Sequence, residues 1–215
     1  GKTYSMIELI KKNYFVCVGI FLSIVLLVIF NEIFFDNKTF GSSDNLSPKA
    51  VGLALNEVME KEGGYPHWQP WVFSGMPTAE AFTNISQLYF PEYLFKIFSV
   101  PGMFIQISHF LFCGIGMVLL LRYLGCSYWS SLLGSIGFMI TPYMVTMLVF
   151  GHGSQIMTAA YIPWIVMFAI KLWNDPKILN IGILSLFLGF QLQRSHVQIA
   201  YYTWLLIGAF FFFKI

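Results

Sequence analysis

The sequence predicts an all-α, polytopic membrane protein in which a bundle of about six transmembrane helices carries one large loop outside the membrane. Hydrophobic residues make up 57% of the 215 residues and charged residues only 10%, against about 25% charge in ordinary soluble domains. Apolar residues come in runs that approach or reach the about 20 residues with which a helix crosses a bilayer. One long polar segment, residues 36–92, interrupts these runs. The net charge of +2 gives no reason to expect a nucleic-acid partner.

Six apolar segments are expected to cross the membrane within a single domain. They cover about residues 14–35, 101–121, 129–150, 156–170, 178–192 and 197–213. Pro142 lies inside the third segment and is expected to kink its helix. Lysines precede the first segment, and the positive-inside rule therefore places the N-terminus in the cytoplasm and residues 36–100 outside. The expected location is a bacterial inner (cell) membrane, and the apolar C-terminal run predicts a fragment of a longer protein.

The outer loop, residues 36–100, contains too many aromatic residues and turn signals for a disordered linker. Ser47-Pro48 is typical of a helix start and Gly63-Gly64 of a helix end, which predicts an amphipathic helix over residues 48–62. A second amphipathic helix is expected over residues 87–100, along the membrane surface. Between the two helices, prolines and glycines are expected to force turns around Trp68 and Trp71.

With this topology the outer ends of the helices collect the unusual polar residues of the chain. These residues are Asp36, Asp44, His67, His152, Gln155, Gln191, Gln193, Arg194 and His196. Arg194 lies in an otherwise apolar stretch, where an ionisable group is either functional or extends toward the lipid headgroups. Its planar guanidinium can bind two phosphate oxygens at once, so a lipid-linked phosphate sugar is a suitable ligand.

Asp44 follows the first span in a Gly-Ser-Ser-Asp-Asn segment. Its carboxylate either acts as a general base, or holds an acceptor hydroxyl or a metal, or else forms a turn or cap before the 48–62 helix. Asp36 has the same interpretations with weaker flanking residues. His152, between two glycines, either lines a cavity or makes a turn, and His109 is expected to hydrogen-bond between helices. The histidine spacings do not indicate zinc, and no metal ligand is assigned.

Five segments together carry a resemblance to a known family. They are GSSDNLSPKAV (41–51), PHWQPWVFSGMPT (66–78), GMVLLLRYLG (116–125), GHGSQIMTAAYIPW (151–164) and LGFQLQRSHVQIAYY (188–202). Over about residues 30–205 the chain resembles the amino-terminal part of the bacterial YfhO-like membrane protein family, which is related to the GT-C superfamily of glycosyltransferases. FSGMPT and QLQRSHVQIAYY are the most specific pieces.

The resemblance implies a GT-C-like enzyme that takes a sugar from a polyprenyl-phosphate carrier and transfers it to an acceptor on the non-cytoplasmic side. In that superfamily the first outer loop carries a catalytic acidic residue, which is matched here by Asp44, with Asp36 as the next candidate. Arg194 and His196 would then face the donor phosphate or the acceptor. The expected reaction is an inverting displacement in which Asp44 accepts a proton from the acceptor hydroxyl and Arg194 stabilises the leaving phosphate.

Further substrate-binding residues are assigned more loosely. They are His152, Gln155, Gln191, His67 and Trp68. The outer loop has no Asp-x-Asp pair, so a divalent cation has no clear motif here. The expected partners are a lipid-linked sugar donor, a glycan or lipid acceptor of the cell envelope, and membrane lipids.

Two other functions stay open from the sequence. A polytopic transporter or lipid flippase is consistent with prolines that break two of the helices, Pro142 and Pro163. A non-catalytic envelope scaffold, in which the outer loop docks a partner, would tolerate replacement of Asp44 and Arg194.

Overall fold

The computed structural model describes residues 13–36, 38–64, 66–71, 73–78, 89–194 and 196–214. The chain is mostly helical, at 77% helix, as the all-α prediction requires. The helices are α2 (Tyr14–Ile29), α3 (Asn31–Phe35), α4 (Ser43–Glu62), α5 (Phe90–Ile97), α6 (Gly102–Tyr123), α7 (Tyr128–Met139), α8 (Pro142–Val149), α9 (Gly153–Ala159), α10 (Ile162–Asn174), α11 (Ile178–Gln193) and α12 (Val197–Lys214). Two short strands, β1 (Trp68–Gln69) and β2 (Met76–Pro77), form an antiparallel pair.

Within the described residues, four helical segments are long and apolar enough to cross a membrane, which indicates a membrane protein. They are Gly102–Tyr123, Tyr128–Val149, Gly153–Asn174 and Val197–Lys214. The apolar helices α2 and α11 have 16 residues each, which is shorter than the about 20 residues of a typical span. The first predicted span, 14–35, is divided at Phe30 into α2 and α3.

Two of the long segments are broken, each near a proline. The kink predicted at Pro142 is confirmed, because α7 ends at Met139 and α8 begins at Pro142. Thr141 caps the new helix through a 3.4 Å hydrogen bond that its Oγ1 accepts from the Met144 amide. Between α9 and α10 the break falls at Tyr161, and Pro163 occupies the first turn of α10, where a missing amide proton costs the helix nothing.

Three predicted boundaries in the polar segments are wrong. The helix predicted over 48–62 begins at Ser43, so Asp44 lies inside its first turn, where the helix dipole stabilises a carboxylate. It ends as expected, at Gly63 with a φ of +73°. The helix predicted over 87–100 is shorter; α5 ends at Ile97, ahead of Ser99, whose φ is +51°, and residues 87–88 lie outside the described residues. The fourth predicted span, 156–170, also starts earlier, because α9 begins at Gly153.

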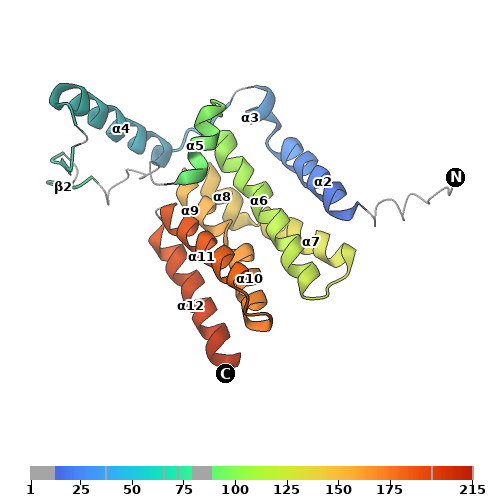
Figure 1. The fold of residues 1–215 in the computed structure, drawn as a ribbon. Helices are drawn as coiled ribbons and strands as arrows, with labels where there is room; N and C mark the ends of the chain where they lie inside the picture. The colour runs from blue at the N-terminus through green and yellow to red at the C-terminus, as the bar shows by residue number, and fades with distance from the viewer. Residues whose placement is uncertain are drawn as a thin grey trace.

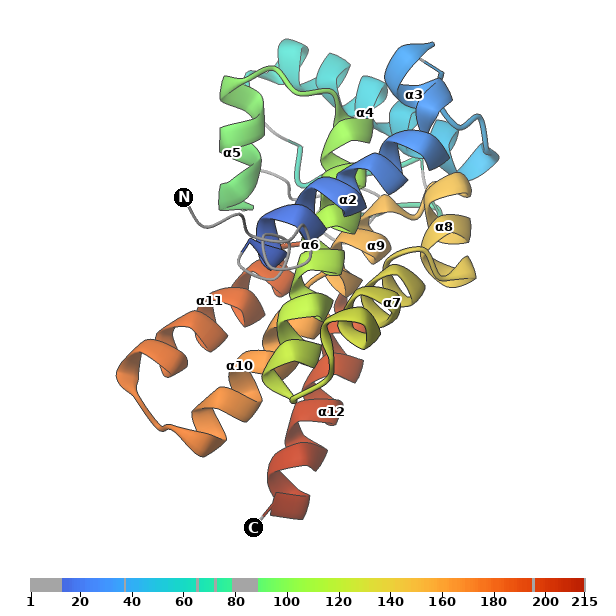
Figure 2. The ribbon, with the colours of Figure 1, turned by 90° about the vertical axis from the view of Figure 1, so that its right-hand side faces the viewer.

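The helices α6 to α12 lie beside one another, and α2 packs along α6 (Figures 1 and 2). The largest buried cluster joins side chains from α2, α6, α7 and α9, among them Leu22, Phe110, Met139 and Ile156. Many large apolar side chains on the outer faces of α2, α7, α11 and α12 are exposed instead. A hydrocarbon environment suits such faces, which agrees with the membrane assignment.

Gly116 lets α6 and α10 pack closely against each other. The Trp164 indole donates a 3.0 Å hydrogen bond to the Phe112 carbonyl and stacks on the Phe112 ring, with 4.9 Å between centroids. A Cβ on Gly116 would lie 2.4 Å from Trp164 Nε1, and the ring is held in place by both contacts. Small residues at such contacts are the usual basis of close helix packing in membranes.

We therefore expect Gly116→Ala to destabilise the protein by about 1–3 kcal/mol through overpacking. The matched control is Gly182→Ala on α11, where an added Cβ meets nothing within 4 Å. Thermal midpoints of the two variants in the same detergent measure the difference. Equal midpoints would show that α6 and α10 do not pack as described.

A small hairpin follows α4 at a distance from the bundle (Figure 1). Trp68 pairs with Pro77 and Gln69 with Met76. Thr78 closes the loop with a 2.7 Å hydrogen bond from its hydroxyl to the Pro66 carbonyl. Gly75 has a φ of +114° and lies against the Trp68 ring. In the described residues of this segment, 66–71 and 73–78, the turns predicted around Trp68 and Trp71 are thus present.

Candidate functional site

The α3, α4 and α5 helices gather at one end of the bundle, which we call the loop end (Figure 1). Here the Asp44 carboxylate, in the first turn of α4, lies 3.6 Å from His152 Nε2. His152 precedes α9, and Gly151 beside it has a φ of +91°, which a residue with a Cβ rarely adopts. The side chains of Asp44 and His152 are 57% and 46% exposed. The structure therefore brings together two predicted site residues that are far apart in the sequence, within reach of solvent.

His196 joins this pair from the turn between α11 and α12. Its Nδ1 accepts a 3.4 Å hydrogen bond from the Ile199 amide in the first turn of α12. An accepting Nδ1 leaves the proton of the neutral ring on Nε2, which is then a donor. Burial lowers the pKa of His196 below its ordinary value, and the charge of nearby His152 lowers it further. We call Asp44, His152 and His196 the Asp44 cluster.

The lowered pKa of His196 predicts a pH dependence of stability. The folded protein holds His196 neutral at a pH where the unfolded chain already binds a proton, so the folded state loses stability as pH falls below about 6.5. The variant His196→Asn keeps a capping acceptor for α12 and removes this titration. We expect its thermal midpoint to fall less than that of the unmodified protein between pH 7.5 and pH 5. Parallel curves would contradict the prediction.

Arg194, directly after α11, is buried, with 2% of its side chain exposed. Its Nη1 lies 3.4 Å from Glu92 Oε2, and its guanidinium carbon lies 4.5 Å from the centroid of the Tyr89 ring. Burial lowers the pKa of Arg194, whereas Tyr89 and Glu92 raise it. Within the described part of the chain, Arg194 Nε has no hydrogen-bond partner. The arginine predicted to bind phosphate therefore has a carboxylate beside it and one unused donor.

Tyr89, whose ring lies against Arg194, links the start of α5 to α6 in the interior of the bundle. His109 Nδ1 donates to the Ile105 carbonyl at 2.7 Å, which leaves Nε2 to accept from the Tyr89 hydroxyl at 3.1 Å. The Tyr161 hydroxyl is hydrogen-bonded to that of Tyr89. His109 thus forms hydrogen bonds as expected, but its partners are the Ile105 carbonyl of its own helix and Tyr89, which lies just before α5. Burial also raises the pKa of Tyr89, so its hydroxyl stays protonated and available as a donor.

Sequence reasoning missed both Glu92 and Tyr89. Glu92 lies on α5 four residues before Lys96, and its carboxylate is 3.9 Å from that ammonium, with Lys96 52% and Glu92 16% exposed. Tyr89 falls in the segment 87–100, which the sequence predicts to lie along the membrane surface. The sequence spacing could indicate only the pair of Glu92 with Lys96, four residues on. Arg194 is 102 residues away from Glu92 and leaves no local pattern.

The other predicted residues lie apart from the Asp44 cluster or serve the fold. Gln155 donates to the Tyr143 hydroxyl, which ties α9 to α8. Gln191 is fully buried and donates to the Thr158 carbonyl at 3.3 Å and to the Thr203 hydroxyl at 2.9 Å. His67 and Trp68 belong to the hairpin beyond α4.

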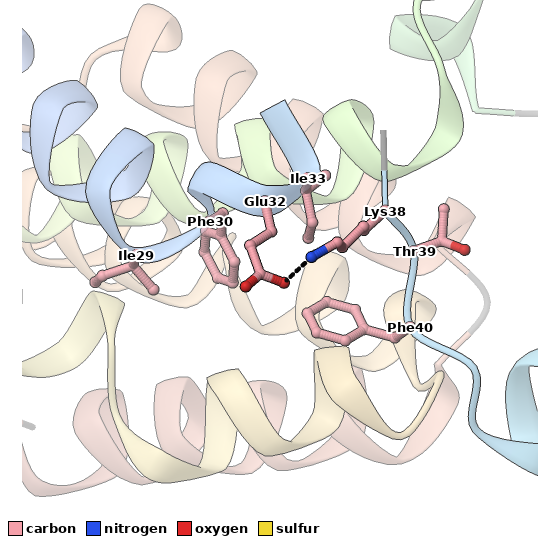
Figure 3. Close-up of a pocket in the computed structure, with 7 residues that line it drawn as sticks. All are labelled: Ile29, Phe30, Glu32, Ile33, Lys38, Thr39 and Phe40. Atoms are coloured by element: carbon pink, nitrogen blue, oxygen red, sulfur yellow. Dashed lines mark hydrogen bonds and ion pairs between the residues drawn. The ribbon is translucent and has the colours of Figure 1, made fainter. Parts of the chain in front are cut away.

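Asp36 lies near a pocket at the ends of α2 and α3. The pocket holds about 190 Å³ and is lined by Ile29, Phe30, Glu32, Ile33, Lys38, Thr39 and Phe40. Figure 3 shows the Lys38 ammonium reaching across it to the Glu32 carboxylate, at 3.2 Å. Asp36 pairs with the same lysine at 3.7 Å but does not line the pocket. The two candidate catalytic acids therefore have different partners, Lys38 for Asp36 and His152 for Asp44.

No group of three or more His, Cys, Asp and Glu side chains in the described ranges is arranged to hold a metal ion. The comparisons with known proteins add no assignment: no family model, no curated protein and no solved structure matches the chain. The geometry of the loop end is therefore the basis for any functional conclusion.

Proposed function

We propose that this chain belongs to an integral membrane glycosyltransferase-like protein that transfers a sugar from a polyprenyl-phosphate carrier to an envelope glycan or lipid on the non-cytoplasmic face. The observation that supports this best is the 3.6 Å approach of Asp44 to His152 at the loop end. A carboxylate beside an imidazole is a pair that can accept and pass on a proton. The pair is solvent-exposed and adjoins helices that are apolar enough for a bilayer.

In this proposal six helical units span a bacterial inner membrane, in a GT-C-like arrangement with residues 36–100 outside. The spans are α2 with α3, α6, α7 with α8, α9 with α10, α11, and α12. At 16 residues, α11 is about 24 Å long, and a short helix is accommodated by local thinning of the bilayer at modest cost. The loop end, which carries the Asp44 cluster, then faces the outside.

The proposed reaction is a single displacement at the anomeric carbon of the donor sugar. Asp44 accepts the proton of the acceptor hydroxyl. At the same time the oxygen of that hydroxyl forms the new bond to the anomeric carbon, from the side opposite the phosphate. The bond between the carbon and the phosphate oxygen breaks, and the lipid phosphate leaves with the electron pair. His152 holds the Asp44 carboxylate and takes up the proton afterwards, and the Nε2 proton of His196 stabilises the leaving phosphate.

Arg194 contributes positive charge to the same phosphate. Its 3.4 Å distance to Glu92 is longer than the 2.7–2.9 Å of a strong charge-assisted hydrogen bond. The Glu92 carboxylate therefore holds the guanidinium loosely, and the unused Nε donor adds a second point of attachment. Because the Arg194 side chain is only 2% exposed, a phosphate with more charge than one carboxylate would bind it in place of Glu92.

The experiment uses membranes from cells that express the protein, with a panel of radiolabelled polyprenyl-phosphate sugars and isolated envelope glycans and lipids as acceptors. We expect label to move from at least one donor to an acceptor, and only when the donor reaches the face that carries the loop end. Membranes without the protein give the background. If no donor gives a product above that background, the proposal fails.

A lipid transporter is the second candidate, favoured by one observation. Two of the segments long enough to span a membrane are broken, at Ile140–Thr141 and at Ala160–Tyr161, and broken helices are common in transporters. Movement of a fluorescent polyprenyl-phosphate analogue between leaflets of proteoliposomes, without any transfer product, would favour this function over the enzyme.

A further inference from the structure

A second cavity, of about 330 Å³, lies between the start of α5 and the helices α6, α10 and α11. Its size falls at the lower end of the about 300–1,000 Å³ typical of ligand pockets. Most of its wall is aromatic, formed by Tyr89, Phe95, Phe112, Tyr161, Phe187 and Phe190. The proposed transfer reaction uses none of these side chains.

The polar groups in this wall are already occupied with one another. The Tyr161 hydroxyl, the Tyr89 hydroxyl and His109 Nε2 form one hydrogen-bonded chain. The Ser108 hydroxyl donates to the Ile105 carbonyl at 2.7 Å. A ligand in the cavity therefore meets aromatic faces and no unused hydrogen-bond donor among these four side chains, which favours an apolar ligand over a sugar or a nucleotide.

The surroundings indicate where such a ligand comes from. The helices α6 and α10 belong to segments apolar enough to cross a membrane, and α11 is apolar as well. The cavity is partly open rather than enclosed. At about 30 Å³ for each water-sized group, the cavity has room for part of one hydrocarbon chain and not for a whole lipid.

The charge near the cavity indicates which headgroup such an apolar ligand carries. Arg194 lies against the ring of Tyr89, which is itself part of the cavity wall. Its single carboxylate neighbour among the described residues, Glu92, lies at 3.4 Å, and its Nε is unpaired within the same part of the chain. A negatively charged headgroup at the loop end is thus complementary to the guanidinium, while the chain of the same molecule extends along the aromatic wall.

We propose that this cavity binds one hydrocarbon chain of an anionic membrane lipid, with the phosphate of the headgroup toward Arg194. An acyl chain of a phospholipid and the chain of a polyprenyl phosphate share this chemistry. The inference goes beyond the proposed transfer reaction, because the binding holds whether or not a sugar is transferred.

The test is photo-crosslinking of the chain in nanodiscs of phosphatidylcholine. Three probes carry a diazirine at the same depth of the chain: phosphatidylglycerol, a polyprenyl phosphate and, as the uncharged comparison, phosphatidylcholine. Peptide mass spectrometry then maps the adducts. We expect an anionic probe to label Phe112, Phe187 or Phe190 in excess of the exposed Leu205 and Leu206 on α12.

The variant Ser108→Phe fills the cavity and is expected to lower this labelling by about tenfold or more, since excluding even two methylene groups is enough for a tenfold loss. The matched control is Ser185→Phe, because Ser185 is exposed on α11. If Ser108→Phe does not fold, excess unlabelled anionic lipid replaces it and is expected to suppress the same adducts.

The two anionic probes distinguish the sources of the chain. Labelling by the polyprenyl probe alone indicates a carrier lipid, and labelling by phosphatidylglycerol alone indicates a structural phospholipid. Labelling that is equal for all three probes, or that Ser108→Phe and the competitor leave unchanged, would overturn the inference. A positive result together with absent sugar transfer would reject the proposed function and keep the lipid site.

Discussion

Replacing Asp44 with Asn is expected to lower sugar transfer by about 10²–10⁴-fold, the usual contribution of a general base, while the helices stay folded. The amide has nearly the shape of the carboxylate but cannot accept the proton of the acceptor hydroxyl. Because the Asp44 side chain is 57% exposed, the substitution leaves no buried charge unpaired. Transfer rates at matched expression, with the thermal midpoint as a check of folding, measure the effect.

The matched control is Glu57→Gln, the same chemical change further along α4. Glu57 forms an exposed pair with Lys61 at 3.9 Å, and its replacement is expected to leave transfer unchanged. His152→Gln is expected to lower transfer as well. The double variant is expected to transfer little less than Asp44→Asn alone, because the two residues act as one unit. Full activity of Asp44→Asn would rule Asp44 out, and Asp36→Asn would be the next variant to assay.

Replacing Glu92 with Gln is expected to destabilise the fold by about 3–5 kcal/mol, since it leaves a charged group in the interior without its partner. Arg194 is 2% exposed and Glu92 16% exposed. The introduced amide has almost the same volume as the carboxylate, so lost packing contributes little. Thermal or denaturant unfolding in detergent measures the change, and Glu57→Gln again serves as control, at about 0–1 kcal/mol for an exposed pair.

The double variant Glu92→Gln with Arg194→Gln separates charge from packing. Removal of both charges is expected to restore part of the lost stability, because no unpaired charge is then buried. If the double variant is less stable than the unmodified protein by the sum of the two single effects, the two side chains do not form the pair described here.

The class of the fold could be predicted because composition and the lengths of apolar runs reflect the solvent that each segment meets. The break at Pro142 was predictable for a local reason, since a proline removes one helical hydrogen bond. The start of α4 was not predictable in this way. Ser47-Pro48 is a good N-terminal signal, but Ser42 at the cap position and Asp44 in the first turn form an earlier and equally good one.

The candidate site was predictable in its residue types and not in its pairings. Sequence alone suggested that Asp44, His152, Arg194 and His196 lie at one end of the helices. It could not indicate that Asp44 would meet His152 or that Arg194 would meet Glu92, because both contacts join segments about 100 residues apart. Such contacts depend on how the helices pack, and a single sequence carries no local trace of that.

The position of Asp44 on α4 has a mechanical consequence. The 20 residues of α4 form a rod about 30 Å long, with Asp44 near the end that touches the bundle and the hairpin of β1 and β2 beyond the other end (Figure 1). When such a rod pivots about its inner end by about 10°, its tip moves by about 5 Å and a group one residue from the pivot by a fraction of 1 Å. In the proposed transferase, such a pivot would let the hairpin follow a large acceptor across the surface while the carboxylate keeps its distance to His152.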